Sequence, residues 1–448
     1  MGARVTDSVL YAHLWGTEEL RAVFDERARL RSWIDILVAL AEVQAELGIV
    51  PIEAARAIAR DANVDRLDLG FVAEETRRTG HSTLGLIHGL QRILPEDAGE
   101  WLYYGITVQD LTDTWAAVAM RSVGVVARRD LRAIEEPLLD LAVRHRDTLM
   151  AGRTHGQPGA PTTFGLKAAG WADEVRRHLE RHREGAPRWL VGQLGGAVGT
   201  LGFFGERGPE LRRRFCERLG LGDPGIAWTS SRDRVAEFGS VLAMVAATLA
   251  RIGNEVVQLQ RPEIGELREP ARTAAVGSIT MPHKRNPEIS EHLVTLSRLV
   301  RANAGVLMEG MVAEHERDGR GWKAEWVAFP EVCLLTGAAL AFARGLVGGL
   351  EVDAEAMRSN LGQYAASEAV LAELSPRMGK HRAQELLQGV LEEARTKGRT
   401  LEEALREHVD PDVVERALHP DPGSAPRDVD AIVARIRVRR DEERDEWP

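Results

Sequence analysis

The segment Gly277–Glu288, GSITMPHKRNPE, concentrates polar and charged side chains that could bind an anion. Lys284 and the arginine after it bring two positive charges. The pair Asn286-Pro287 predicts a helix start, since asparagine is a favoured N-cap and proline is favoured in the first helical position. The positive end of that helix would attract a carboxylate and favour an ionised hydroxyl at Ser278. We therefore expect an anion site here, although an ordinary turn with solvated charges would use the same residue types.

A second polar cluster is the segment Tyr103–Thr114, YYGITVQDLTDT. It places Thr107, Gln109, Asp110 and neighbouring threonines at the expected start of a long helix. Such side chains can hydrogen-bond a carboxylate, and they can equally well cap the helix. The segment is therefore a candidate carboxylate site whose structural alternative stays open.

Two further clusters each contain a histidine. RTHGQP holds His155 beside a Gly-rich bend, and TGHST holds His81. Both are candidate general acids or bases, and for both a structural role is the alternative. None of the histidines belongs to an HExxH motif, so we expect neither a metal nor another cofactor.

Long helices must position these clusters, because apolar residues recur at helical spacing between them. From Glu237 to Gln260 they return about every 3.6 residues. Similar patterns run over 288–312, over about 112–150 with a kink or interruption expected at Pro137, and over about 329–350. Helices this long bury their apolar faces best against one another, which predicts an all-α fold with a central bundle.

Changes in expected helix length and in charged-residue content along the sequence divide the chain into three expected parts. These are an N-terminal helical domain over 1–105, a central long-helix bundle over 106–358 and a small helical domain over 359–448. The 448 residues are 44% apolar and carry a net charge of -10, which argues against a nucleic-acid binder. Cys216 and Cys333 have no CxxC partner, so no disulfide framework is expected. No apolar run suggests a membrane span and no signal peptide is evident, so we expect a cytoplasmic enzyme.

Taken in order, the clusters resemble those of the fumarase/aspartase superfamily. GSITMPHKRNP resembles its signature loop, GSSxMPxKxNP, and YGITVQDLTDT resembles the turn that holds a substrate carboxylate. RTHGQPGAPTTFGLKAAGW resembles the segment that carries the acid histidine. The resemblance spans nearly the whole chain. It implies a homotetramer with a fumarase/aspartase-type bundle, in which each active site is shared by three chains.

The resemblance also implies a reaction on a small dicarboxylate, while the net charge and the lack of a long apolar run predict no nucleic-acid or membrane partner. Family members remove a proton beside a carboxylate of a substituted succinate and release fumarate. By position, Ser278 on a mobile loop would be the base and His155 the acid, a role that His81 would orient or share. The residues expected at the substrate are Thr107, Gln109, Thr154, Lys284, Asn286, Ser82, Met281 and Arg301.

Two branches of the superfamily match best. QLGGAVGT, SRDRVAEFGS and EHERDGRGWKAEW resemble 3-carboxy-cis,cis-muconate cycloisomerase, whereas TGHST and TTFGLK resemble adenylosuccinate lyase. Three positions depart from the family pattern. Ile279 replaces the second serine of the signature loop, and Val108 replaces the serine after the carboxylate-binding threonine. Gly80 replaces the arginine that would serve a nucleotide phosphate, which puts a nucleotide substrate in doubt.

Three functions follow from this. We favour a lyase that expels a nitrogen-containing group, an amine or nitrite, from a small succinate, as nitrosuccinate lyases of the superfamily do. The alternative is a cycloisomerase that forms a lactone from a carboxymuconate. A non-catalytic role, like that of lens crystallins derived from these lyases, is disfavoured by the intact set Ser278, Lys284, Asn286 and His155.

Overall fold

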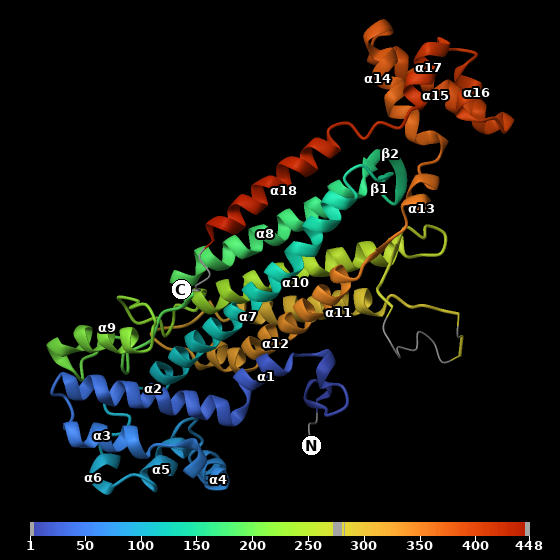
Figure 1. Cartoon of the computed structure of the whole chain (residues 1–448). Helices are drawn as coiled ribbons and strands as arrows, with labels where there is room; N and C mark the ends of the chain where they lie inside the picture. Colours follow the sequence, from blue (N-terminus) through green and yellow to red (C-terminus); the bar gives the residue numbers. More distant parts are fainter. Residues whose placement is uncertain (1–3, 272–279, 282, 444–448) are drawn as a thin grey trace.

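The computed structural model describes residues 4–271, 280–281 and 283–443, and most of them lie in α-helices. Long helices run side by side through the middle of the molecule, with shorter helices at both ends (Figure 1). This arrangement confirms the predicted all-α fold with a long central bundle. The bundle consists of α7 (Val108–Arg144), α8 (Phe164–Trp189), α10 (Asp233–Leu259), α11 (Glu288–Glu309) and α12 (Gly319–Gly348).

The apolar stripes expected from the sequence form the core of the bundle. In α10 every stripe residue from Phe238 to Leu259 is at most 5% exposed. In α11 the stripe from Ile289 to Leu307 is also buried, whereas Met311 is 46% exposed because it lies beyond the end of the helix. Helical spacing therefore predicted the buried faces correctly and extended one of them too far.

Prolines do not end the long helices. α7 continues through Pro137 and α12 through Pro330. A proline removes one backbone hydrogen bond, and the helices packed around α7 hold it together across that gap. α12 also begins at Gly319, well before the apolar run expected from Phe329, because its first turns already bury Trp322.

Two bundle helices, α10 and α12, are long and apolar enough to cross a membrane by length and composition alone. However, most of the apolar part of each helix is buried inside the molecule. The apolar residues of both helices therefore serve the core of the bundle.

The N-terminal part consists of short helices at one end of the bundle (Figure 1). α2 packs on both α7 and α9, and Gln44 Nε2 donates to the Tyr104 carbonyl oxygen at 2.8 Å. These contacts fix the segment that leads into α7. The helices are α1 (Glu18–Phe24), α2 (Glu26–Glu46), α3 (Ile52–Asp61), α4 (Leu69–Thr79), α5 (Leu84–Gln91) and α6 (Glu96–Gly99). α9 (Gly208–Arg218), which follows α8 in the chain, packs against α2 at this end.

The C-terminal part has a small core of its own, built by α14 to α17. The last helix, α18, leaves that part and returns along α8, where its buried residues belong to the main core (Figure 1). The predicted boundary at 359 would place α18 in the small domain, and the domain division stays a prediction. The helices are α13 (Ala354–Ser359), α14 (Ser367–Met378), α15 (Lys380–Lys397), α16 (Leu401–Leu405), α17 (Pro411–Leu418) and α18 (Ala425–Glu442).

Short strands connect the long helices at the end of the bundle away from α2. β1 (Leu149–Thr154) and β2 (Gln157–Thr163) form an antiparallel hairpin between α7 and α8. β3 (Leu267–Arg268) pairs antiparallel with β4 (Glu351–Val352). The sequence did not predict the hairpin, because its many Gly and Pro residues conceal the alternation of a strand.

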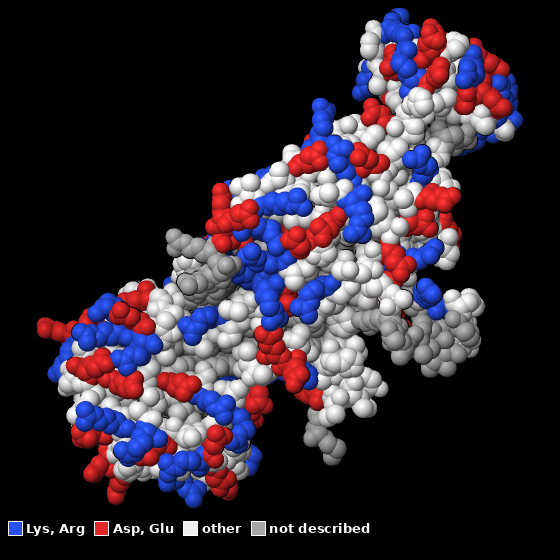
Figure 2. All heavy atoms as spheres, viewed as in Figure 1, with Lys and Arg blue, Asp and Glu red and all other residues white. Residues whose placement is uncertain are grey.

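The surface carries both signs of charge. Figure 2 shows Lys and Arg side chains interspersed with Asp and Glu on the visible face, most densely at the two ends of the molecule.

Candidate active site

A cationic site lies where α7 begins. Thr107, directly before α7, accepts a hydrogen bond at Oγ1 from Nη1 of Arg317 at 2.9 Å. Nη2 of Arg317 donates to the carbonyl oxygens of Gly196 and Ala197 at 3.4 and 3.1 Å. These partners are all neutral, and Arg317 Nε is buried without an acceptor among the described residues. A guanidinium fixed by neutral oxygens beside a helix start is well placed to bind a carboxylate.

Asp110 fixes the backbone around this site. Its carboxylate accepts hydrogen bonds from the backbone N–H groups of Thr107, Gly195 and Gly196 at 2.9, 2.7 and 3.0 Å. The pKa of Asp110 is raised to about 7, because the effect of burial is larger than the opposing effect of these hydrogen bonds. Asp110 therefore ties the start of α7 to the Gly-rich segment that also holds Arg317.

Gln109 lies deeper in the core and is fully buried. Its Nε2 donates to the Thr229 carbonyl oxygen at 3.1 Å and to Asp113 Oδ2 at 3.4 Å. Gln109 therefore makes contacts within its own chain. Its predicted contact with substrate stays a prediction.

His81 and Ser82 lie in the short connection between α4 and α5. His81 Nδ1 is 3.3 Å from both the backbone nitrogen and Oγ1 of Thr83. Ser82 lines a cavity together with Thr112 of α7, which places it near the Thr107 end of the bundle. Gly80 ends α4 with a φ of +63°, a left-handed conformation that favours glycine. Gly80 therefore caps the end of α4, and it offers no side chain that could bind a phosphate.

His155 stands at the tip of the β1–β2 hairpin. His155 and Gly156 form a two-residue turn between paired Thr154 and Gln157, and both turn residues have positive φ, 53° and 74°. This combination is characteristic of a type I′ hairpin turn, which is unfavourable for a non-glycine residue. The turn holds the exposed imidazole out from the bundle, with Thr154 exposed beside it.

A buried carboxylate anchors this hairpin to the segment before the signature loop. Glu266 is fully buried and accepts hydrogen bonds from Arg153 Nη2 and Nη1 at 2.5 and 2.9 Å. Asn360 Nδ2 also donates to Glu266, at 2.9 Å. Because Arg153 lies two residues before His155, Glu266 helps to position the candidate acid.

The far end of the signature loop borders a wide cleft of about 990 Å³. Lys284 is exposed there and Asn286 is half-buried, and both line the cleft with Arg261 and Arg268. Met281, which precedes them, is 44% exposed. The cleft is therefore rich in cations, as an anion site requires. Ser278, the predicted base, lies outside the described residues.

The start of α11 differs from the prediction. The helix begins at Glu288, so Pro287 is its N-cap and not its first residue. The amides expected to face an anion are occupied, since Ile289 and Ser290 donate their backbone N–H groups to Glu269 at 3.2 and 2.7 Å. A carboxylate of the chain itself therefore neutralises the positive helix end, and the positive charges at the cleft are those of side chains.

One chain does not bring the predicted residues together. Thr107 and the β1–β2 hairpin lie at opposite ends of α7, whose 37 residues span about 55 Å. The hairpin and the start of α11 lie toward the end of the bundle away from α2–α6 (Figure 1). Arg301 is apart from both groups, exposed on α11, where its Nε donates to the Ser297 carbonyl oxygen at 3.2 Å. The predicted roles of all these residues stay predictions.

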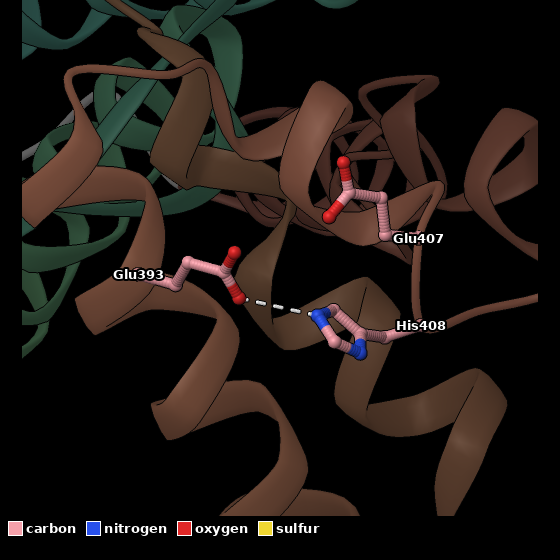
Figure 3. Close-up of side chains that lie close together, drawn as sticks. All are labelled: Glu393, Glu407 and His408. Carbon is pink, nitrogen blue, oxygen red and sulfur yellow. Dashed lines mark hydrogen bonds and ion pairs between the residues drawn. The ribbon is translucent and has the colours of Figure 1, made fainter.

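A cluster with metal-like geometry lies elsewhere, on the surface of the small C-terminal part. Figure 3 shows Glu393, Glu407 and His408, whose ligand atoms lie within 4.8 Å of one another. Lys397 Nζ and Arg399 Nη2 already bind the two carboxylates, at 2.6 and 2.7 Å. The cluster is thus a salt-bridged surface group, and we assign it no metal.

Comparison with known proteins decides the family. The model of the lyase family matches residues 15–301. The chain belongs to the fumarase/aspartase superfamily of lyases. It is 40% identical to N-acetyl-S-(2-succino)cysteine lyase of Dickeya dadantii, over 97% of this chain and 98% of that protein. It is also 37% identical to nitrosuccinate lyase of Streptomyces davaonensis, over 90% and 88% of the two chains.

A solved member of the superfamily has the same fold. This is the 3-carboxy-cis,cis-muconate lactonizing enzyme from Pseudomonas putida, with a TM-score of 0.88 and 32% identity over 96% of this chain and 99% of that one. The superfamily and the branches predicted from the motifs are thereby confirmed.

Sequence reasoning missed three charged residues of this lyase. Glu266 and Glu269 lie outside the segments that resemble the family motifs. Arg317 lies inside one of them, EHERDGRGWKAEW, and its charge within that segment was the only indication of a functional role. Glu266 and Glu269 gave no local signal, since their partners are far away in the chain.

Removing the carboxylate of Glu269 should loosen the start of α11. Losing a helix cap costs about 0.5–2 kcal/mol, so Glu269→Ala should unfold at lower urea concentration than the parent, and Glu269→Gln should fall between them. Glu263→Ala is the matched control, because Glu263 is exposed and forms a long ion pair with Arg261, at 3.6 Å. Equal urea midpoints for the Glu269 and Glu263 alanine variants would show that the cap does not stabilise the fold.

Proposed function

We propose that this protein releases fumarate by β-elimination from a small succinate that carries a leaving group at C2. The contact between Arg317 and Thr107 carries the proposal, because it offers a fixed cation and a hydroxyl to a carboxylate. The 40% identity to N-acetyl-S-(2-succino)cysteine lyase supports the same type of reaction.

In the proposed reaction, ionised Ser278 Oγ takes a proton from the carbon beside one carboxylate. The electron pair of that C–H bond moves into the carboxylate and gives a doubly negative intermediate. Lys284 and Asn286 would hold this carboxylate, while Arg317 and Thr107 hold the other. The electron pair then returns to form the C=C bond of fumarate as the bond to the leaving group breaks.

The leaving group departs with the electrons of the broken bond, and His155 would supply a proton where one is needed. A thiol has a pKa of about 8.5 and leaves easily as a thiolate, whereas an amine needs a proton. Identity to N-acetyl-S-(2-succino)cysteine lyase supports a thiol, so we place N-acetyl-S-(2-succino)cysteine first among the substrates. The predicted nitrogen leaving group is the second candidate, supported by the likeness to nitrosuccinate lyase.

We further propose a homotetramer in which three chains complete each active site. The distance along α7 between Thr107 and the hairpin supports this, because a site built around Thr107 would have to take its hairpin residues from another chain. Solvent-exposed apolar side chains on α10 and α11 also support the homotetramer, since a second copy of the chain would cover them. These are Met244, Leu299, Val306 and Met308, which are 41%, 39%, 39% and 56% exposed.

A substrate panel tests the proposed reaction. Fumarate release is followed by ultraviolet absorbance with N-acetyl-S-(2-succino)cysteine, nitrosuccinate, aspartate and 3-carboxy-cis,cis-muconate. We expect fumarate from the first compound with the highest kcat/KM. Lactone formation from the muconate without fumarate from any succinate would assign the cycloisomerase alternative instead.

Adenylosuccinate should be a poor substrate or none. Gly80 leaves no cation where a nucleotide phosphate would need one, and its left-handed backbone disfavours any larger side chain there. The measurement is kcat/KM for adenylosuccinate beside that of the best small succinate. Comparable values for the two compounds would contradict the assignment to small substrates.

A further inference from the structure

The corner between α4 and α5 holds His81 in one orientation. The backbone N–H of His81 donates to Thr79 Oγ1 at 3.3 Å, and Thr79 Oγ1 donates to the Glu75 carbonyl oxygen at 2.8 Å. The ring atom Nδ1 of His81 lies 3.3 Å from both the backbone nitrogen and Oγ1 of Thr83. His81 is therefore tied to the end of α4 through its backbone and to the start of α5 through its imidazole.

The two helices that form this corner are in close contact. Gly85, in the first turn of α5, faces α4 so closely that a Cβ atom there would lie 2.2 Å from Thr76 Oγ1 and 2.3 Å from the Val72 carbonyl oxygen. Glu75 of α4 also binds His88 of α5, with Oε1 2.6 Å from Nδ1. The corner is thus tightly packed and can hold a side chain in a fixed place.

The contact with Thr83 decides which nitrogen of the His81 ring carries the proton. A hydroxyl can donate or accept, but a backbone N–H can only donate, so Nδ1 must be the acceptor. In a neutral imidazole one nitrogen accepts and the other carries the proton. The proton of His81 therefore lies on Nε2, and Nε2 can donate a hydrogen bond but cannot take up a proton.

The Nε2 edge of the ring is accessible. His81 is half-buried although Thr83 is fully buried. Among the residues that the structure describes, Nε2 has no hydrogen-bond partner and is not one of the buried polar atoms that lack a partner. A ligand can therefore reach this donor from solvent.

Tyr103 connects this corner with the cationic site at the start of α7. Burial raises the pKa of the Tyr103 hydroxyl, and the nearby Thr83 side chain lowers it. The charges of Asp110 and Arg317 also act on this hydroxyl, the first raising its pKa and the second lowering it. The hydroxyl is thus near both the residue that holds the His81 ring and the arginine proposed to bind a carboxylate. Tyr103 also has a φ of +62°, which is strained for a residue of its size.

We infer that His81 donates a hydrogen bond from Nε2 to a carboxylate oxygen of the substrate, and that the backbone N–H of Thr83 fixes the tautomer that allows this. The inference rests on the proposed function and makes His81 a binding residue. A hydrogen bond to an ionised carboxylate is stronger than one between neutral groups. Loss of the Nε2 proton would leave an imidazolate anion, so the role of acid stays with His155.

Two substitutions distinguish the two ring nitrogens, because a glutamine amide nitrogen can reach the place of Nε2 and an asparagine amide reaches only that of Nδ1. His81→Gln should keep the KM of the best small succinate within about threefold of the parent value. His81→Asn and His81→Ala should raise this KM about 10- to 100-fold, the loss of a hydrogen bond to a charged group. The kcat of all three variants should stay within about threefold of the parent, because no proton transfer is lost.

His88→Gln is the matched control, because His88 belongs to the same corner, is 37% exposed and binds Glu75. It should keep the parent KM and kcat. A loss of kcat of about 10²-fold or more that is equal in His81→Gln and His81→Ala would show proton transfer at His81 and overturn the inference. An unchanged KM in His81→Asn would overturn it as well.

The position of the ring proton is measured directly by 15N NMR of enzyme labelled at histidine, at alkaline pH. His81 is identified as the signal that His81→Gln lacks. We expect the proton on Nε2 in the parent and in Thr83→Val, which loses the hydroxyl but keeps the backbone N–H. A proton on Nδ1 would overturn the inference whether or not the enzyme releases fumarate.

A binding measurement separates this inference from the reaction itself. If no substrate of the panel releases fumarate, the proposed reaction fails, and the Kd of succinate decides about His81. It should rise about tenfold or more in His81→Asn and stay near the parent value in His81→Gln. Equal Kd values for the parent and His81→Asn, or no binding of succinate to the parent, would contradict a carboxylate contact of His81.

Discussion

The Ser278→Ala enzyme should bind fumarate and lose about 10²- to 10⁴-fold in kcat, the usual cost of removing a catalytic base. Ser278 matches the family position of the base, and its hydroxyl can accept the proton. Binding should survive because Thr107, Lys284 and Asn286 do not depend on this hydroxyl to hold the carboxylates. The measurements are kcat from fumarate release and the Kd of fumarate for the same preparation.

Thr280→Ala provides the control for this loop. Thr280 is exposed, carries the same functional group and matches no catalytic family position. We expect it to keep most of the parent activity. Should Ser278→Ala turn over within about threefold of the parent, a difference too small for a lost base, the base lies elsewhere and the proposed mechanism is wrong.

Arg317→Ala should lower kcat/KM by about 10- to 100-fold. The estimate follows from a charged hydrogen bond of about 1.5–3 kcal/mol and a factor of ten for each 1.4 kcal/mol. The larger change should appear in KM, because Arg317 would bind the carboxylate that does not react. Arg317→Lys should recover only part of the loss, since an ammonium group cannot span Thr107 and Gly196 as the guanidinium does.

Arg320→Ala is the matched control for Arg317. Arg320 lies three residues further on, is exposed and pairs with Asp318 and Glu314 at 2.7 and 2.9 Å. A role of Arg317 in folding alone would lower the urea midpoint and leave the KM of active enzyme unchanged. That result, or equal kinetic effects for the two arginines, would remove Arg317 from the substrate site.

The helices could be predicted because their apolar spacing is a local property of the sequence. The stripe of α10 was predicted from Glu237 to Gln260 and the helix spans Asp233–Leu259, with the expected side chains buried. The β1–β2 hairpin was not predicted, because its turn depends on positive φ at His155 and Gly156, which residue types reveal only weakly.

The candidate site could be predicted only in part. The Thr107 segment and the histidine segments were found from polar residues at breaks in the apolar pattern. Arg317 was not predicted, because its partner Thr107 lies 210 positions away in the chain. The expected anion site at α11 was wrong in one respect, since only the folded chain places Glu269 on the helix amides.

The helical class, the buried faces of the long helices and the superfamily followed from the amino-acid sequence alone, because periodicity and short motifs are local properties of the chain. The pairing of distant charges became evident only in the folded chain. It closed the positive end of α11 with Glu269, saturated Arg232 between two carboxylates and left Arg317 with neutral partners. These outcomes depend on which distant residues meet in a low-dielectric interior, where an unpaired charge is costly, and spacing along the chain does not encode those meetings.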